Sequence, residues 1–194
     1  DRPAGAASIR PDQIFGGAGT SDVVAYGGSS SAITADLQAF TFSGGDATGD
    51  VYSGIEGVSG SSFADNLFGD GNANRLFGHG GNDFLQGRGG NDILDGGNGD
   101  DWLDGGAGAD TIFGGAGTND VVAYGGSSSA INADLQAFTF SGGDATGDIY
   151  AGIEGVSGSG FGDQLFGDGN VNRLFGQNGN DFLMGRGGND ILEG

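Results

Sequence analysis

The sequence contains no cysteine and only one histidine among its 194 residues. Without cysteine, neither a disulfide framework nor a thiolate metal site is available. A Ser-His-Asp arrangement needs a histidine, and the single one, His79, is replaced by Gln177 where the surrounding sequence recurs. We therefore expect that this chain is not an enzyme.

Basic residues and long apolar runs are also scarce. Six Lys and Arg stand against 26 Asp and Glu, which gives a formal charge of -20. Such a chain repels nucleic-acid phosphates and anionic membrane surfaces, so we expect no nucleic-acid partner and no membrane insertion by this segment. No apolar run reaches the ~18 residues of a membrane span, and no cleavable signal is present. Any export signal is expected outside this segment.

Glycine is in large excess, with 47 residues, while only 36% of the residues are hydrophobic. Glycine loses more backbone freedom on folding than any other residue, and acidic, glycine-rich chains without periodicity stay disordered. A thick apolar core is excluded, so something besides apolar burial must hold this chain folded.

The sequence is one unit copied twice with a period of 98 residues. Residues 14–96 and 112–194 differ at 12 of 83 aligned positions. Residue 194 corresponds to residue 96 in mid-array, so we expect a piece of a longer protein. The predicted division is a leader or cap at 1–13, a first module at 14–111 (irregular strand-rich block 16–59, nonapeptides 60–111) and a second module at 112–194 (irregular block 114–157, nonapeptides 158–194).

The nonapeptide blocks repeat a nine-residue pattern, for example GHGGNDFLQ at 78–86 and GRGGNDILD at 87–95. Position 1 is Gly, position 6 is Asp or Asn, and position 8 is Leu or Ile. Six glycine-rich residues favour a tight loop, and the next three favour a short strand whose central residue points inward. The predicted core is the column of inward residues: Leu67, Leu76, Leu85, Leu94, Leu103 and Ile112.

Two loop-strand units make one turn of 18 residues, so position 6 of one unit lies above position 6 of the unit two further on. Carboxylates then stack in columns about 5 Å apart and repel one another unless a cation lies between them. Calcium fits because it takes six to eight hard oxygen ligands. The predicted metal residues are Asp65, Asp83 and Asp101; Asn74, Asp92 and Asp110; Asp163 and Asp181; Asn172 and Asp190; and, one place late in their loops, Asp22 and Asp120.

Ten such units resemble the calcium-binding nonapeptide repeats of the repeats-in-toxin (RTX) family, whose G-G-x-G-x-D-x-U-x pattern they share. The resemblance implies an all-β fold, a right-handed parallel β-roll stapled by several calcium ions. Each ion is then expected to take the position 6 carboxylate and backbone carbonyls from two loops 18 residues apart. The carbonyls implied are those of Ser61, Phe63, Gly78, His79, Gly80, Gly81, Gly87, Gly89, Gly90, Gly96, Asn98, Gly105, Ala107, Gly176, Asn178, Gly185 and Gly187.

The resemblance also implies a secreted or cell-surface bacterial protein exported by type I secretion, and a chain that folds on binding calcium. Our preferred hypothesis is a structural or adhesive segment of a larger protein, with self-association end to end. Two alternatives stay open: a carbohydrate-binding or folding-assisting module of an extracellular polysaccharide-modifying enzyme, and the C-terminal calcium region of a toxin or protease. The sequence also leaves open whether Asp46, Asp50 and Glu56 of the irregular block bind calcium.

Overall fold

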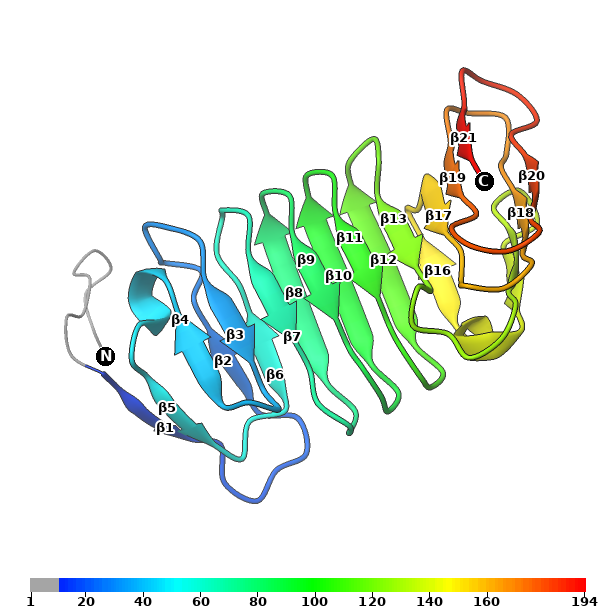
Figure 1. Cartoon of the computed structure of the whole chain (residues 1–194). Helices are drawn as coiled ribbons and strands as arrows, with labels where there is room; N and C mark the ends of the chain where they lie inside the picture. Colours follow the sequence, from blue (N-terminus) through cyan, green and yellow to red (C-terminus); the bar gives the residue numbers. More distant parts are fainter. Residues whose placement is uncertain (1–10) are drawn as a thin grey trace.

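Short parallel strands joined by glycine-rich loops wind through the whole structure, a computed structural model that describes residues 11–194 (Figure 1). The expected leader or cap falls outside the described residues, except for 11–13. Within 11–194, the only helices are two single turns of 3-10 helix. The predicted all-β parallel roll is confirmed.

The first nonapeptide block forms a two-sided roll. Consecutive strands alternate between two sheets, and each pairs in parallel with the strand two further on. Leu67 pairs with Leu85 and Leu76 with Leu94, which is the predicted turn of 18 residues. The strands are β7 (Asn66–Phe68), β8 (Arg75–Gly80), β9 (Phe84–Gln86), β10 (Ile93–Asn98), β11 (Trp102–Asp104) and β12 (Thr111–Ala116).

The irregular blocks belong to the same solenoid but take longer turns. Parallel partners here are 38, 34 or 32 residues apart, so three parallel strands fit into one turn. A fourth strand in the turn pairs antiparallel with one of these three. In the first module the elements are β1 (Gln13–Phe15), β2 (Val23–Ala25), β3 (Thr34–Asp36), β4 (Thr41–Ser43), η1 (Gly45–Ala47), β5 (Val51–Ser53) and β6 (Gly57–Ser59).

The second module repeats this arrangement and ends in further nonapeptide turns. Its elements are β13 (Val121–Ala123), β14 (Asn132–Asp134), β15 (Thr139–Ser141), η2 (Gly143–Ala145), β16 (Ile149–Ala151), β17 (Gly155–Ser157), β18 (Gln164–Phe166), β19 (Arg173–Phe175), β20 (Phe182–Met184) and β21 (Ile191–Glu193).

Each irregular block ends one sheet and begins another. The six-stranded sheet runs from β2 to β16 and stops there, while β14 begins a new sheet that continues through β18 and β20. The nine-stranded sheet passes through this junction, from the antiparallel edge strand β4 and its neighbour β3 to β21. The final turns, β18 to β21, are therefore turned relative to the central roll (Figure 1).

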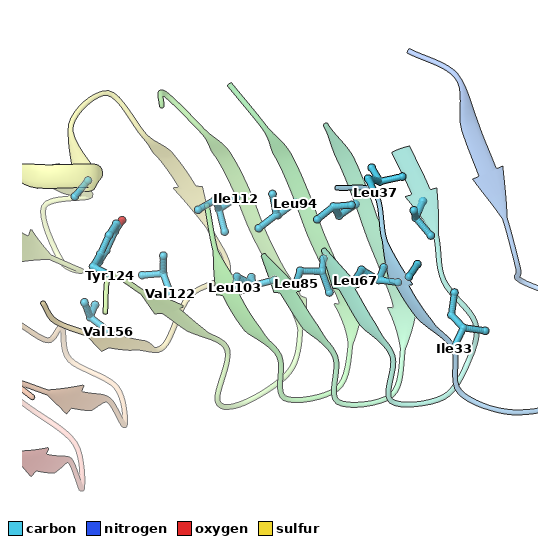
Figure 2. Packing of buried hydrophobic residues seen from close by; sticks show 14 of the residues in the cluster. Ile33, Leu37, Leu67, Leu85, Leu94, Leu103, Ile112, Val122, Tyr124 and Val156 are labelled. Carbon is cyan, nitrogen blue, oxygen red and sulfur yellow. The ribbon is translucent and has the colours of Figure 1, made fainter. Parts of the chain in front are cut away.

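A single row of apolar side chains runs along the inside of each sheet (Figure 2). All six predicted core residues, from Leu67 to Ile112, have no solvent-exposed surface. Their neighbours in each strand face outward, as strand alternation requires. The core is thin but unbroken, and it continues through Val122, Val156, Leu165 and Leu174 of the second module.

Leu94→Ala is expected to lower the free energy of unfolding by about 2–5 kcal/mol, because it leaves a cavity in a core one residue wide. Its sister residue in the second module supplies the matched control. Leu192 is 46% exposed, against 0% for Leu94, so Leu192→Ala should cost clearly less. Urea denaturation in saturating calcium measures both, and equal losses would contradict this account of the core.

Candidate metal centres

The side chains whose oxygen atoms could bind a metal lie immediately before the strands, two residues ahead of the inward-facing residue. The structure stacks all the predicted position 6 residues in columns, and Asp22 and Asp120 join them despite standing one place late. The six-stranded sheet has Asp22, Glu56, Asn74, Asp92, Asp110 and Asp148; the nine-stranded sheet has, from β7 onward, Asp65, Asp83, Asp101, Asp120, Glu154, Asn172 and Asp190; the four-stranded sheet has Asp163 and Asp181.

A backbone N–H joins most members of a column to the carboxylate of the next member. The backbone N–H of Asp83 donates to Oδ1 of Asp101 over 2.8 Å, and that of Asp92 donates to Oδ1 of Asp110 over the same distance. The backbone N–H of Asp101 donates in turn to Oδ1 of Asp120 at 2.8 Å. This bond fixes one carboxylate oxygen and sets the separation of the layers.

The second carboxylate oxygen has no hydrogen-bond partner at six of these residues. It is buried in each case, and a buried acceptor without a donor or cation is costly. The six atoms are Oδ2 of Asp22, Asp83, Asp92, Asp101, Asp110 and Asp120.

Glycine at position 1 makes room for this oxygen. A Cβ on Gly78 would collide with Oδ2 of Asp83 and would lie 2.5 Å from the carbonyl oxygen of Gly96 in the next turn. Gly87 stands in the same relation to Oδ2 of Asp92 and the carbonyl of Gly105. Carboxylate and carbonyl oxygens from two layers thus share one crowded space beside a residue without a side chain.

In two loops of each module, hydrogen-bond donors of the same loop satisfy the position 6 side chain instead; we call these the self-closing loops. Oδ1 of Asp65 accepts the Ser61 hydroxyl at 2.8 Å, and Oδ2 accepts the Ser61 backbone N–H at 2.5 Å. Oδ1 of Asn74 accepts the N–H of Asp70, while its amide nitrogen donates to the carbonyl of Glu56. Asp163 and Asn172 repeat these patterns.

The predicted carbonyls fall into three groups. The carbonyls at position 1 each lie beside the position 1 glycine of the previous turn, in the loop that also carries the position 6 Asp or Asn. They belong to Gly78, Gly87, Gly96, Gly105, Gly176 and Gly185. At position 3, the carbonyls of Asn98 and Ala107 accept N–H groups from Gly81 and Gly90. In the third group, the carbonyls of Gly81 and Gly90 lie beside Gly99 and Gly108, next to Oδ1 of Asn82 and of Asp110 respectively. For the carbonyls of Ser61, Phe63, His79, Gly80, Gly89, Asn178 and Gly187, calcium binding stays a prediction. Asp181 and Asp190 are only half-buried.

The donor set fits calcium. Within residues 11–194, no three His, Cys, Asp or Glu side chains converge on one point, so a bound ion must also take carbonyl and water oxygens. Hard oxygen ligands of this mixed kind are what calcium prefers, whereas structural zinc sites are built from Cys and His. The unpaired Oδ2 atoms are the carboxylate oxygens left available to such an ion.

Sequence reasoning missed Glu154 and Asp148 and left their equivalents Glu56 and Asp50 undecided. Each obeys the signal that identifies the other members, an acid two residues before an inward apolar or aromatic residue, as in Glu154-Gly155-Val156. Asp148 is held by protein donors: its Oδ1 accepts the N–H of Asp110 at 2.8 Å, and its Oδ2 accepts the hydroxyl of Tyr150 at 2.5 Å.

Burial raises the pKa of the stacked carboxyls in the protein alone. The pKa of Asp83 and of Asp92 rises to about 7, and that of Asp101 and of Asp110 to about 6. The backbone N–H that each carboxylate accepts lowers its pKa, and neighbouring carboxylates raise it. Protons and cations therefore compete for the same oxygens.

Four segments of the chain match the family model of the RTX calcium-binding nonapeptide repeat: 59–94, 86–121 and 95–128, which overlap, and 157–194. Together they cover more than half of the chain. No curated protein matches the chain. Among the helices of residues 11–194, none has the length and apolar character needed to cross a membrane.

Acid is expected to promote folding of the metal-free chain. These carboxyls have a folded pKa of about 6 to 7 against 3.8 for an ordinary Asp, so they stabilise the metal-free fold fully below pH ~3.8 and lose this effect as the pH rises through 6 to 7. Far-UV circular dichroism of chelator-dialysed protein should show more β structure at pH 5 than at pH 8. A β signal that is the same at both values would contradict it.

Proposed function

This chain belongs to the RTX calcium-binding nonapeptide-repeat family, and from that premise we propose that it is a secreted structural and adhesive segment of a larger bacterial protein. RTX nonapeptide repeats bind several calcium ions across successive repeats. The observation that carries the proposal is the row of buried Oδ2 atoms without partners. The buried carboxylate oxygens of such a chain are satisfied only where a cation is present.

We assign the regular sites to the loops of Asp83, Asp92, Asp101 and Asp110. Their support is the unpaired Oδ2 of each residue and the position 1 carbonyls that crowd the same glycines, as at Gly96 and Gly105 for the first two. The bound ion supplies positive charge between stacked carboxylates. The residues themselves fix the layer spacing through their backbone hydrogen bonds and exclude side chains from the site at position 1.

Folding and calcium binding are then one process, because the ligands come together only in the folded solenoid. Extracellular calcium modules bind with dissociation constants of about 0.1 to 1 mM. Such sites stay empty at cytosolic calcium and fill outside the cell. A chain that folds only after export suits a secreted protein.

The surroundings of the single histidine support a non-catalytic role. Nε2 of His79 lies 2.6 Å from the hydroxyl of Ser59. In the second module, the side-chain amide of Gln177 donates to the hydroxyl of Ser157 at 2.9 Å. Since glutamine makes the same contact, the contact serves to join neighbouring strands and needs no proton transfer.

Calcium titration of the chelated 194-residue chain tests this proposal. We expect a disordered far-UV circular dichroism spectrum in chelator and a β-rich spectrum in millimolar calcium, because the stacked charges oppose folding until cations neutralise them. Equal β content in chelator and in calcium would sink the proposal.

The variant Asp83→Asn tests one assigned site by the same calcium titration. Asn already occupies position 6 at Asn74, so the loop tolerates an amide, but the variant loses a charge and a ligand. The calcium midpoint of folding should therefore rise. Asp95→Asn removes one charge from the outward position 9 and should leave the midpoint close to wild type; equal shifts in both variants would indicate a general charge effect and contradict the assigned site.

End-to-end association of copies of this chain would give the segment its adhesive role. β21 and β20 lie at the edges of their sheets, and an exposed strand edge pairs with another chain. Phe182 and Leu192 on these strands are about half exposed, while their sister residues Phe84 and Leu94 lie under the next turn. The equivalent strands β9 and β10 each pair with a further turn, so in solutions of the 194-residue chain we expect a second copy to supply that pairing.

Sedimentation velocity is expected to show concentration-dependent oligomers in calcium and monomers in chelator. Leu192→Lys, which puts a charge on the edge strand, should shift the distribution toward monomer. Phe138→Lys, at an exposed hairpin position away from that edge, is the control. Monomers at every concentration in calcium, or equal loss in both variants, would remove this part of the proposal.

A further inference from the structure

Each irregular block contains one unusually short turn within a column of acids. β16 ends at Ala151 and β17 begins at Gly155, so the turn between them has three residues, Gly152, Ile153 and Glu154. The loop of a nonapeptide has six. The first module repeats the turn as Gly54–Glu56, and both turns lie outside the segments that match the RTX family model. In both, the residue before the strand is Glu rather than Asp.

The longer Glu side chain compensates for the shorter turn. Oε2 of Glu154 accepts the backbone N–H of Asp120 at 3.1 Å, just as Oδ1 of Asp120 accepts the N–H of Asp101 at 2.8 Å. The first module has the same bond, from the N–H of Asp22 to Oε2 of Glu56 at 3.0 Å. One additional methylene group thus keeps a carboxylate in the column where the backbone has been shortened.

Asp120 faces this turn with an oxygen that has no partner. The residue is 0% exposed, and its Oδ2 is buried without a hydrogen bond. A Cβ on Gly114 would collide with the carbonyl oxygen of Gly152 and would lie 2.9 Å from Oδ2 of Asp120. The carbonyl and the unpaired carboxylate oxygen therefore flank the same glycine.

The regular turns have the same arrangement. A Cβ on Gly96 would collide with Oδ2 of Asp101 and would lie 2.7 Å from the carbonyl oxygen of Gly114. Gly152 thus takes the place of a position 1 glycine, although the rest of its loop is missing. Its φ of +65°, matched by +66° at Gly54, is a left-handed conformation that favours glycine.

We propose that loop 114–120 and the turn Gly152–Glu154 bind a hard divalent cation through the carboxylates of Asp120 and Glu154 and the carbonyl oxygen of Gly152. Asp22, Glu56 and Gly54 form the equivalent site in the first module, where Oδ2 of Asp22 is also unpaired. That the cation is calcium rests on the proposed function. The remaining ligands are waters and loop carbonyls, since calcium takes six to eight oxygens.

Two carboxylates at this junction distinguish it from the self-closing loops. Asn172, the next member of the column, is an amide whose nitrogen donates to the carbonyl of Glu154, so it adds no negative charge. Asp120 and Glu154 are the last two acids before that amide. A cation bound between them extends the column of bound ions into the irregular block. The two regular blocks are then connected by this column of ions as well as by the apolar core.

Counting bound ions by native mass spectrometry in calcium tests the site on the full chain. Glu154→Gln keeps an acceptor for the N–H of Asp120 but removes the charge, and Glu154→Asp keeps the charge but shortens the side chain. Both variants should bind one calcium ion fewer than wild type. Glu56→Gln should also lose one, and the double variant Glu56→Gln with Glu154→Gln should lose two.

Glu193→Gln, an exposed glutamate outside the columns, is the matched control and should bind the full number of ions. Circular dichroism in calcium checks that each variant is folded, and the two modules give independent sites if one variant fails to fold. Wild-type stoichiometry in Glu154→Gln and Glu56→Gln overturns this inference alone if Asp83→Asn still loses an ion. A wild-type chain that binds no calcium overturns the proposed function as well.

Discussion

The structure depends on carboxylates stacked at the spacing of β-strands. Each regular turn sets one Asp above another, about 5 Å away, and binds the two by a single N–H to Oδ1 bond. The remaining Oδ2 is buried without a donor, so the fold places like charges where water cannot screen them. RTX repeats bind calcium, and that cation explains how a chain with 36% hydrophobic residues holds together around one row of apolar side chains per sheet.

The sequence was sufficient to predict the regular blocks in detail. The nine-residue period fixes both the 18-residue turn and the inward column, and Leu76, Leu94 and Ile112 pair in the expected register. It was insufficient for residues 16–59 and 114–157, because strand pairing there depends on loops of unequal length. Periodicity could not show that the roll opens to three parallel strands and one antiparallel strand per turn, nor that Glu154 reaches the column, since neither follows from a fixed spacing.

The irregular blocks change the direction of growth of the solenoid. Three parallel strands per turn allow one sheet to end at β16 while another begins at β14 and its antiparallel partner β15. The same step separates β1 and β5 from the sheets that follow them. Buried acids at the ends of this step are satisfied by tyrosines: Asp50 accepts the hydroxyls of Tyr26 and Tyr52, and Asp148 accepts that of Tyr150. A hydroxyl donor takes the role there that we propose for a cation in the regular turns.

Buried acids in this chain are thus stabilised in two different ways, and their order along the chain follows a rule. Oδ2 is unpaired in the regular turns from Asp83 to Asp110 and at Asp22 and Asp120, where the irregular blocks begin. Protein donors satisfy Asp50, Asp65 and Asp163, later in these blocks or just after them. A solenoid is held by contacts between neighbouring turns, so turns closed by protein donors need no cation to dock on the next turn. Dependence on calcium is therefore expected in the regular turns and where each irregular block begins, and protein donors replace the cation in the rest of that block.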